Sequence, residues 1–237
     1  MSDPFPTTNW TAIRALQDTP NEGHRLAFAH LYRRYWPPLF AYLRHRGHEP
    51  DAASDMLQAF FVHLLDREVA AGLELTGKLR AYLLAALKNF ERDQWHRDRA
   101  QKRHPGTPLL SLDAEGAEAR LRNLSGSELT PDQVYERQWA ADMVHRTLER
   151  LRHTEIRAER GRAFDLLKPH LLGDEDATPY AELAAAEGVT TSAIKVRVHR
   201  LRERFRRFLE EDIEFTVAPH DVASEANHIL GVHRSPE

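Results

Sequence analysis

The sequence contains no cysteine, and this absence limits what the protein can be. Without thiols the chain has no disulfide framework, no cysteine-ligated zinc and no cysteine nucleophile. It also lacks an apolar run of the roughly 18 residues that a membrane-spanning helix needs. Its start, MSDPFPTTNW, has neither the basic segment nor the apolar core of a signal peptide. We therefore expect a cytoplasmic protein with no membrane span.

Several catalytic and cofactor-binding motifs are missing as well. The chain has no GxxxxGK[ST] phosphate-binding loop, no GxSxG nucleophile turn and no HExxH zinc motif. The 14 histidines do not change this, because the tightest pair, His45 and His48, has the spacing of no common metal site. The sequence therefore favours a protein that is not an enzyme, with no catalytic residue, no metal site and no cofactor.

A net basic charge is also absent. The 33 lysines and arginines are outnumbered by 36 acids, which gives a net charge of −3. A nucleic-acid-binding surface would therefore have to be local. Two segments have such a local excess: residues 78–103 carry eight lysines and arginines against three acids, and residues 195–207 carry seven against one.

Helical periodicity is what the sequence has in abundance, and no alternating strand pattern stands out. We expect helices over roughly 21–46, 51–65, 79–103, 130–151, 155–172, 178–188, 191–211 and 221–230. Thr130 and Thr178 are each followed by proline, which is a helix-start signal. The predicted fold class is all-α, with two helical domains joined by a flexible linker.

The predicted organisation has five parts. Residues 1–20 form an N-terminal extension, 21–103 the first domain, 104–130 the linker, 131–211 the second domain and 212–237 a C-terminal extension. The linker is assigned because 104–130 is rich in proline, glycine and serine and has no sustained apolar period.

The segment 178–209 has the spacing of a helix-turn-helix motif. Leu183 and the small Ala184 suit a closely packed first helix, and Gly188 suits a turn whose backbone takes a positive φ. The second helix of such a motif enters the major groove, where its N-terminal half reads base edges. A solvated amphipathic helix with an arginine-rich face is the alternative. The apolar residues of the predicted second helix recur at intervals of four and three and form one buried face: Ile194, Val198, Leu201, Phe205 and Phe208.

Polar and small residues on the other faces of this helix are the predicted DNA contacts. Lysines and arginines further along the helix would meet phosphates. The predicted DNA-binding residues are Thr190, Thr191, Ser192, Lys195, Val196, Arg197, His199 and Arg200.

The stretch YAELAAAEGVTTSAIKVRVHRLR, residues 180–202, resembles the region-four helix-turn-helix of extracytoplasmic-function sigma factors, a class within the sigma-70 family of RNA polymerase initiation factors. The resemblance implies that this element binds the −35 region of a promoter. The matching residues are Tyr180, Leu183, Ala184, Gly188, Val189, Ile194, Lys195, Arg197 and Arg200.

The stretch from residue 28 to 65, FAHLYRRYWPPLFAYLRHRGHEPDAASDMLQAFFVHLL, resembles the start of region two in the same family. Ser54 stands where the family often has an acid. A plain solvated face is the alternative for this helix. The matching residues are Leu31, Tyr32, Tyr35, Asp51, Ala52, Asp55, Gln58 and Phe61. The resemblance implies that the clamp helices of core RNA polymerase are bound by Asp51, Asp55, Gln58 and Phe61.

The stretch LRAYLLAALKNFERDQWHRDRAQKR, residues 79–103, resembles the next part of region two, which melts and reads the −10 element. Aromatic rings beside cations also suit unstacked bases, although Tyr82 equally fits core packing. The matching residues are Tyr82, Leu83, Lys88, Asn89, Asp93, Arg97, Arg99, Lys102 and Arg103. By this resemblance the expected −10-binding residues are Lys88, Asn89, Arg92, Asp93, Trp95, His96, Arg97 and Arg99.

The resemblance covers roughly residues 25–103 and 131–211. It predicts a two-domain sigma factor that binds core RNA polymerase and promoter DNA, with an anti-sigma factor or another regulator as a candidate partner. Two other functions stay open: a helix-turn-helix regulator that does not bind polymerase, and a sigma mimic that sequesters an anti-sigma factor. The basic, aromatic segment 79–103 argues against the first, and the presence of both basic segments argues against the second.

Overall fold

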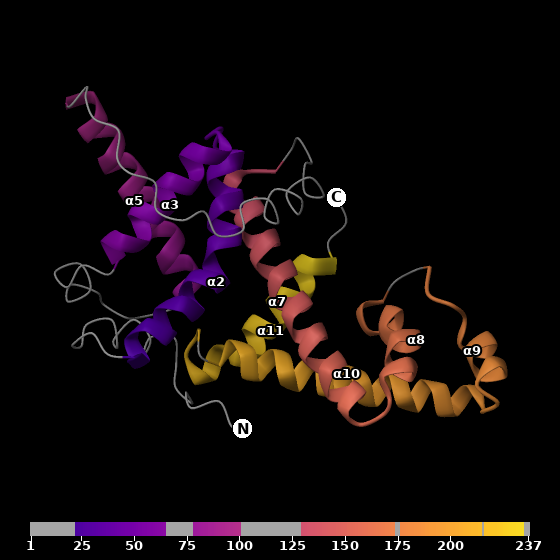
Figure 1. Ribbon diagram of the computed structural model, residues 1–237. Helices are drawn as coiled ribbons and strands as arrows, with labels where there is room; N and C mark the ends of the chain where they lie inside the picture. The colour runs from indigo at the N-terminus through magenta and orange to yellow at the C-terminus, as the bar shows by residue number, and fades with distance from the viewer. Residues whose placement is uncertain (1–21, 65–77, 101–128, 174–175, 215, 235–237) are drawn as a thin grey trace. The chain divides into compact units, whose positions relative to one another are not determined.

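The computed structural model describes residues 22–64, 78–100, 129–173, 176–214 and 216–234. Within these ranges all regular structure is helical and no strand occurs (Figure 1), which confirms the predicted all-α class for this part of the chain. No helix among the described residues is long and apolar enough to cross a membrane.

The helices lie close to the predicted ranges. They are α2 (Glu22–His45), α3 (Pro50–Leu64), α5 (Leu79–Ala100), α7 (Pro131–Arg157), α8 (Gly161–Leu172), α9 (Tyr180–Ala186), α10 (Thr191–Ile213) and α11 (Val222–Arg234). A short 3-10 turn, Pro219–Asp221, precedes α11. The largest differences from prediction lie between α7, expected to end near Leu151, and α8, expected to begin near Glu155. Helix α7 continues because no helix breaker intervenes, and Glu159, with a φ of 59°, ends the following turn.

The described residues form two compact units. The first contains those of Met1–Trp139 and Glu214–Asp221, and the second those of Ala140–Ile213 and Val222–Pro236. The first turns of α7 and the segment after α10 therefore belong to the first unit. The domain boundaries expected from the sequence fall at other residues and stay predictions.

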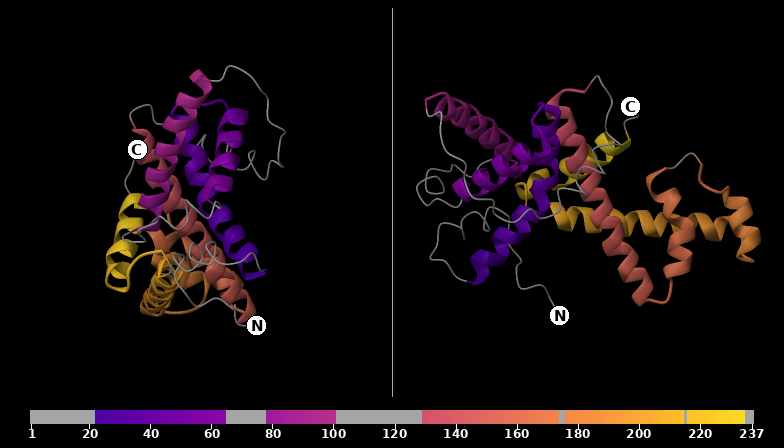
Figure 2. Two further views of the ribbon diagram at one scale, coloured as in Figure 1. Left: turned by 90° about the vertical axis from the view of Figure 1, so that its left-hand side faces the viewer. Right: turned by 45° about the horizontal axis from the view of Figure 1, so that its top comes forward.

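The core of the first unit is formed by α2, α3 and α5, which pack side by side (Figure 2). Helix α2 runs through Pro37 and Pro38 without ending. The segment after α10 joins this unit through its backbone, because the Leu79 N–H donates to the Thr216 carbonyl at 3.1 Å. The fully buried side chains of the three helices include Leu31, Tyr35, Leu39, Phe40, Leu57, Phe60, Leu83 and Leu87.

The start of α7 completes this core. The Gln133 N–H donates to Thr130 Oγ1 at 3.3 Å, and the Thr130 N–H donates to Gln133 Oε1 at 2.8 Å, which is a reciprocal capping box. The predicted start signal at Thr130 is thus confirmed. The buried Tyr135 hydroxyl donates to the Arg80 carbonyl at 2.9 Å. Burial raises the pKa of Tyr135 well above its usual value, so the phenol stays a donor.

The second unit is organised around α10, with α8, α9 and α11 packed against it. Helices α8 and α9 lie beside the first half of α10 (Figure 1). The Arg202 guanidinium joins α10 to the end of α8, donating to the His170 carbonyl at 2.6 and 3.1 Å. This carbonyl is one of those that a helix end leaves without an intrahelical donor. Helix α8 then stops at Gly173, which has a φ of 80°.

Candidate nucleic-acid interface

A tight turn joins α9 to α10. Gly188 has a φ of +63°, as predicted, and the Val189 N–H donates to the Ala184 carbonyl at 3.0 Å. Thr190 then caps α10, because its Oγ1 accepts from the Ala193 N–H at 3.2 Å. Thr190, a predicted DNA contact, therefore also stabilises the start of α10. The turn fixes where the first residues of α10 are presented.

The start of α9 lies slightly later than the sequence suggested. The helix begins at Tyr180, and Pro179 stands at the cap without a side-chain hydrogen bond. Its carbonyl accepts from the Glu182 and Leu183 N–H groups at 3.0 and 3.1 Å. The predicted cap at Thr178 is therefore wrong. Proline cannot donate, so placing it outside the first turn costs the helix no hydrogen bond.

The apolar face predicted for the motif is buried as expected. Leu183 and Ala184 are about 5% and 4% exposed. The five predicted core positions of α10 are all buried as well: Ile194, Val198, Leu201, Phe205 and Phe208. Because this face is fixed in the core, the opposite face of α10 must point to solvent.

The solvent face of α10 carries most of the predicted DNA contacts. With about 100° per residue, Ser192 and Val196 point farthest from the buried face among the predicted contacts, and His199 lies beside them. Lys195 and Arg197 flank Val196, one on each side. The threonine at 191 is half-buried. The exposed members of the predicted set are Thr190, Ser192, Lys195, Val196, Arg197, His199 and Arg200.

The cations in the first half of α10 have no polar partner among the described residues: Lys195, Arg197 and Arg200. They are therefore available to an external anion. His199 lies 3.2 Å from Glu203, so the middle of this face has one acid beside the imidazole.

The cations in the second half of α10 are bound to the protein itself. Arg206 pairs with Glu210 at 2.9 Å. Arg207 lies 3.8 Å from Glu211. Arg202 is held by the α8 carbonyl described above. The basic run at residues 195–207 thus has two parts. The cations of the first have no polar partner among the described residues, and those of the second are engaged by groups of the protein itself.

A buried carboxylate anchors the middle of α10. The Glu155 side chain, on α7, is 3% exposed and pairs with Arg204 of α10. The Arg160 Nε donates to the same carboxylate at 2.8 Å from the turn before α8. Two guanidinium groups therefore compensate the buried charge of Glu155. Burying this carboxylate without such partners would be strongly destabilising.

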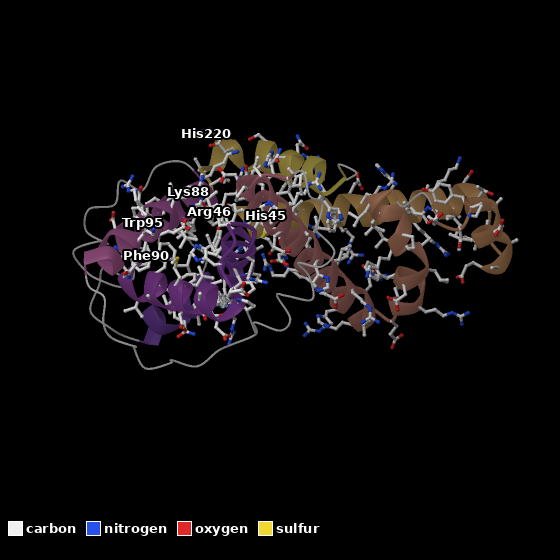
Figure 3. All side chains as sticks on the ribbon, turned by 90° about the horizontal axis from the view of Figure 1, so that it is seen from above. His45, Arg46, Lys88, Phe90, Trp95 and His220 are labelled. Atoms are coloured by element: carbon white, nitrogen blue, oxygen red, sulfur yellow. The ribbon has the colours of Figure 1, made fainter. Side chains whose placement is uncertain are left out.

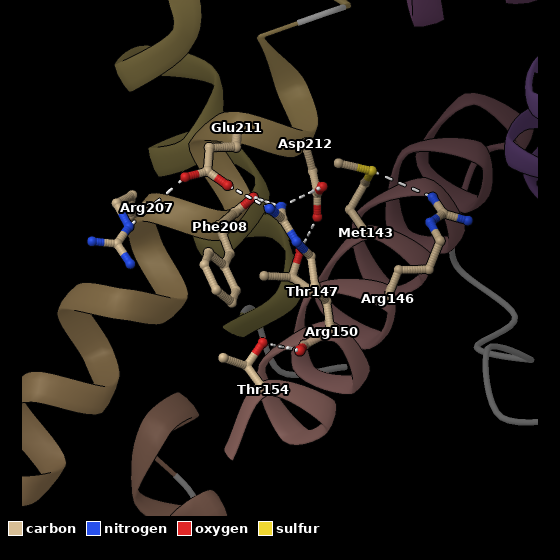
Figure 4. A network of polar contacts seen from close by, with 9 residues as sticks. All are labelled: Met143, Arg146, Thr147, Arg150, Thr154, Arg207, Phe208, Glu211 and Asp212. Atoms are coloured by element: carbon tan, nitrogen blue, oxygen red, sulfur yellow. Dashed lines mark hydrogen bonds and ion pairs between the residues drawn. The ribbon is translucent and has the colours of Figure 1, made fainter. Parts of the chain in front are cut away.

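A second network holds the end of α10 against α7 (Figure 4). Arg150 donates to Asp212 at 3.0 Å and to Glu211 at 2.5 Å. Its guanidinium also lies 4.3 Å from the centre of the Phe208 ring. The Thr147 hydroxyl donates to Asp212 at 3.1 Å. The sequence interpretation missed this network. A signal in the sequence was the acidic run at residues 210–212, which begins three residues after the basic run ends.

The first unit carries the second predicted DNA surface, along α5. Lys88 pairs with Asp132 at 2.6 Å and lies 5.8 Å from the Tyr42 ring. Trp95 is 53% exposed and is labelled with Lys88 in Figure 3. Burial raises the pKa of the half-buried Tyr82. The remaining exposed members of the predicted set are Asn89, Arg92 and Asp93. The side chains of His96, Arg97 and Arg99 lie outside the described part.

The predicted polymerase-binding residues of α3 divide between surface and core. Asp51 and Asp55 are exposed and Gln58 is half-buried. Phe61 is 1% exposed, and its ring centre lies 4.9 Å from that of Tyr32. Phe61 therefore packs inside the unit and offers no surface to a partner.

Helix α3 also has an exposed apolar residue that the sequence interpretation did not single out. Val62 is 60% exposed. Together with Asp51, Asp55 and Gln58 it follows a spacing of four, three and four, so these residues form one stripe. This spacing was visible in the sequence and could have identified Val62.

Comparison of the chain with protein-family models, with curated proteins and with solved structures gives no match.

Proposed function

We propose that this protein is a sigma factor of the sigma-70 family, which brings core RNA polymerase to promoter DNA. The observation that carries the proposal is the helix-turn-helix formed by α9 and α10. Its solvent face presents Lys195, Arg197 and Arg200, none of which has a polar partner among the described residues. A helix with this face suits the major groove, where cations meet phosphates and guanine edges.

The position of each cation on α10 suggests its role. Lys195 and Arg197 lie on the two flanks of the solvent face, so each is placed for a phosphate on one side of the groove. Arg200 lies closer to the centre, one turn after Val196, and can offer its fork of donors to a guanine. In this proposal α10 binds the −35 element.

The surface of α5 supports a role at the −10 element. Asn89 and Asp93 are exposed one turn apart, and Trp95 offers an aromatic ring to solvent. Stacking on such a ring is worth about 1–3 kcal/mol per base, which offsets part of the cost of unstacking a duplex. Lys88 would have to exchange Asp132 for a phosphate. We assign α5 to the bases of the melted strand.

The stripe on α3 is our candidate surface for core polymerase. Two carboxylates, Asp51 and Asp55, precede Gln58 and the apolar Val62 along one face. Such a face fits a partner with basic side chains around an apolar contact. Binding through α3 would also tether the two DNA surfaces to one enzyme, which raises their effective concentration at a promoter.

The test is co-purification of the full-length protein with core RNA polymerase. Asp55→Arg places a repulsive charge in the stripe and should reduce retention at least tenfold, since such reversals cost several kcal/mol. Glu49→Arg is the matched control. Glu49 is exposed and precedes α3 outside the stripe, so its reversal should leave retention unchanged.

Co-purification combined with DNA-site selection and with capture of candidate partners separates the competing functions. A wild-type chain that selects DNA sites but never binds core polymerase would be a helix-turn-helix regulator. A chain that binds neither polymerase nor DNA, but captures an anti-sigma factor, would be a sigma mimic. Full retention of Asp55→Arg on polymerase would remove α3 from the proposal.

A further inference from the structure

We infer that Val196 reads the C5-methyl group of a thymine in the major groove, which makes it a specificity-determining residue of α10. The inference builds on the proposed function and names one feature of the DNA sequence that the protein selects. It starts from an exposed apolar side chain in a place where folding does not require one.

Val196 is exposed at the centre of the DNA-facing side of α10. Its exposed fraction is 49%, whereas Ile194 and Val198, two residues before and after it, are 1% and 2% exposed. It therefore lies outside the core. Valine also favours a helix less than alanine does, because its branched Cβ restricts the side chain. Helix stability gives no reason for a valine at this position.

The neighbours of Val196 are arranged as a groove-binding face would require. Ser192 precedes it by one turn and Arg200 follows by one turn, and both are exposed. Lys195 and Arg197 lie on either side, without a polar partner among the described residues. If these two cations reach the phosphates that border the groove, the residue between them lies over the base edges.

The chemistry of Val196 then restricts what it can recognise. It has no donor or acceptor, so it cannot read the hydrogen-bonding pattern of a base pair. Of the four bases, only thymine presents a methyl group in the major groove. Burying the thymine methyl group against Val196 should increase the affinity for DNA about fourfold. A cytosine at the same position would place a polar amino group against the apolar side chain.

The experiment removes the methyl group and nothing else. Duplex sites are first selected from a random-sequence library by the full-length protein in the presence of core RNA polymerase. Each thymine of the selected site is then replaced by deoxyuridine, which keeps the hydrogen-bonding pattern. Binding is measured for the wild type, for Val196→Ala and for Ile156→Ala. The last variant truncates an exposed apolar side chain on α7, outside the surfaces proposed to bind DNA or polymerase.

The expected result is a coupling at one position of the site. There deoxyuridine should weaken the wild type and Ile156→Ala about fourfold, whereas Val196→Ala should lose nothing further. If Val196→Ala responds to deoxyuridine as the wild type does at every position, the inference is overturned and the proposed function stands. If the wild type selects no site at all, both are overturned.

Discussion

The two halves of α10 carry similar side chains and differ in what those side chains do. In the first half, Lys195, Arg197 and Arg200 face solvent without a polar partner among the described residues. In the second half the arginines bind protein groups, and Arg204 does so against a buried carboxylate. The difference shows that a count of basic residues measures charge but not its availability to DNA. Folding engages the basic residues of one half and leaves those of the other without a polar partner among the described residues.

The largest effect should come from the most deeply engaged arginine. Arg204→Ala leaves the Glu155 carboxylate with Arg160 alone and should lower the free energy of unfolding by about 3 kcal/mol. Urea denaturation at neutral pH measures this change. Arg206→Ala is the matched control, because it removes only an exposed pair with Glu210 and should cost about 0.5 kcal/mol or less. Equal losses would mean that Arg160 suffices to compensate Glu155.

The next effect should appear in DNA binding without a change in stability. Arg200→Ala should weaken binding to a selected −35 duplex by about 1–3 kcal/mol, which is the value of a good base contact. Fluorescence anisotropy with the full-length protein measures it. Arg207→Ala, in the engaged half, should change affinity much less. If the two variants lose affinity equally, the halves of α10 do not differ in function.

A smaller effect should appear in the salt dependence of binding. If Lys195 meets a phosphate, Lys195→Ala should reduce the slope of log affinity against log salt by about 0.9. The loss should be similar for all duplex sequences, since a phosphate contact carries no sequence information. Arg206→Ala should leave the slope unchanged. A sequence-dependent loss for Lys195→Ala would instead assign this lysine to a base.

The smallest effect concerns an exposed ion pair outside α10. Arg152 hydrogen-bonds Asp165 at 2.9 Å and holds the pKa of that carboxyl below its ordinary value. A carboxyl group whose pKa is lowered by folding stabilises the protein at any pH above its ordinary pKa. This stabilisation is lost as the pH falls through the lowered pKa. Urea denaturation from about pH 7 down to pH 3 should therefore show a small advantage over Asp165→Asn that shrinks with acid. An advantage that does not change with pH would exclude this pair as its source.

The sequence was sufficient for the local features of the site. The buried face of α10 follows from apolar residues at intervals of four and three, and Gly188 marks a turn because its backbone has a positive φ. Such features depend on residues within a turn or two of each other. They can be predicted because the periodicity of a helix fixes which side chains share a face.

Features that depend on distant residues were not predictable in the same way. Glu155 and Arg204 both look like surface residues in the sequence, and only the packing of α10 on α7 brings them together and buries the carboxylate. The spacing of Phe61 in the sequence fits both a core residue and a polymerase contact. Its burial against the Tyr32 ring of α2 shows that it is a core residue. Lys88 was assigned to DNA before its partner Asp132 could be known.

The order of synthesis limits when the hydrogen bond between the Leu79 N–H and the Thr216 carbonyl can form. The N–H at the start of α5 obtains its acceptor only after the ribosome has added the residues of α10. The first unit therefore cannot be completed until most of the second unit has also been made, although most of the first unit's residues are made before it. A contact between residues so far apart in sequence is costly to close early, so we expect it to form late in folding.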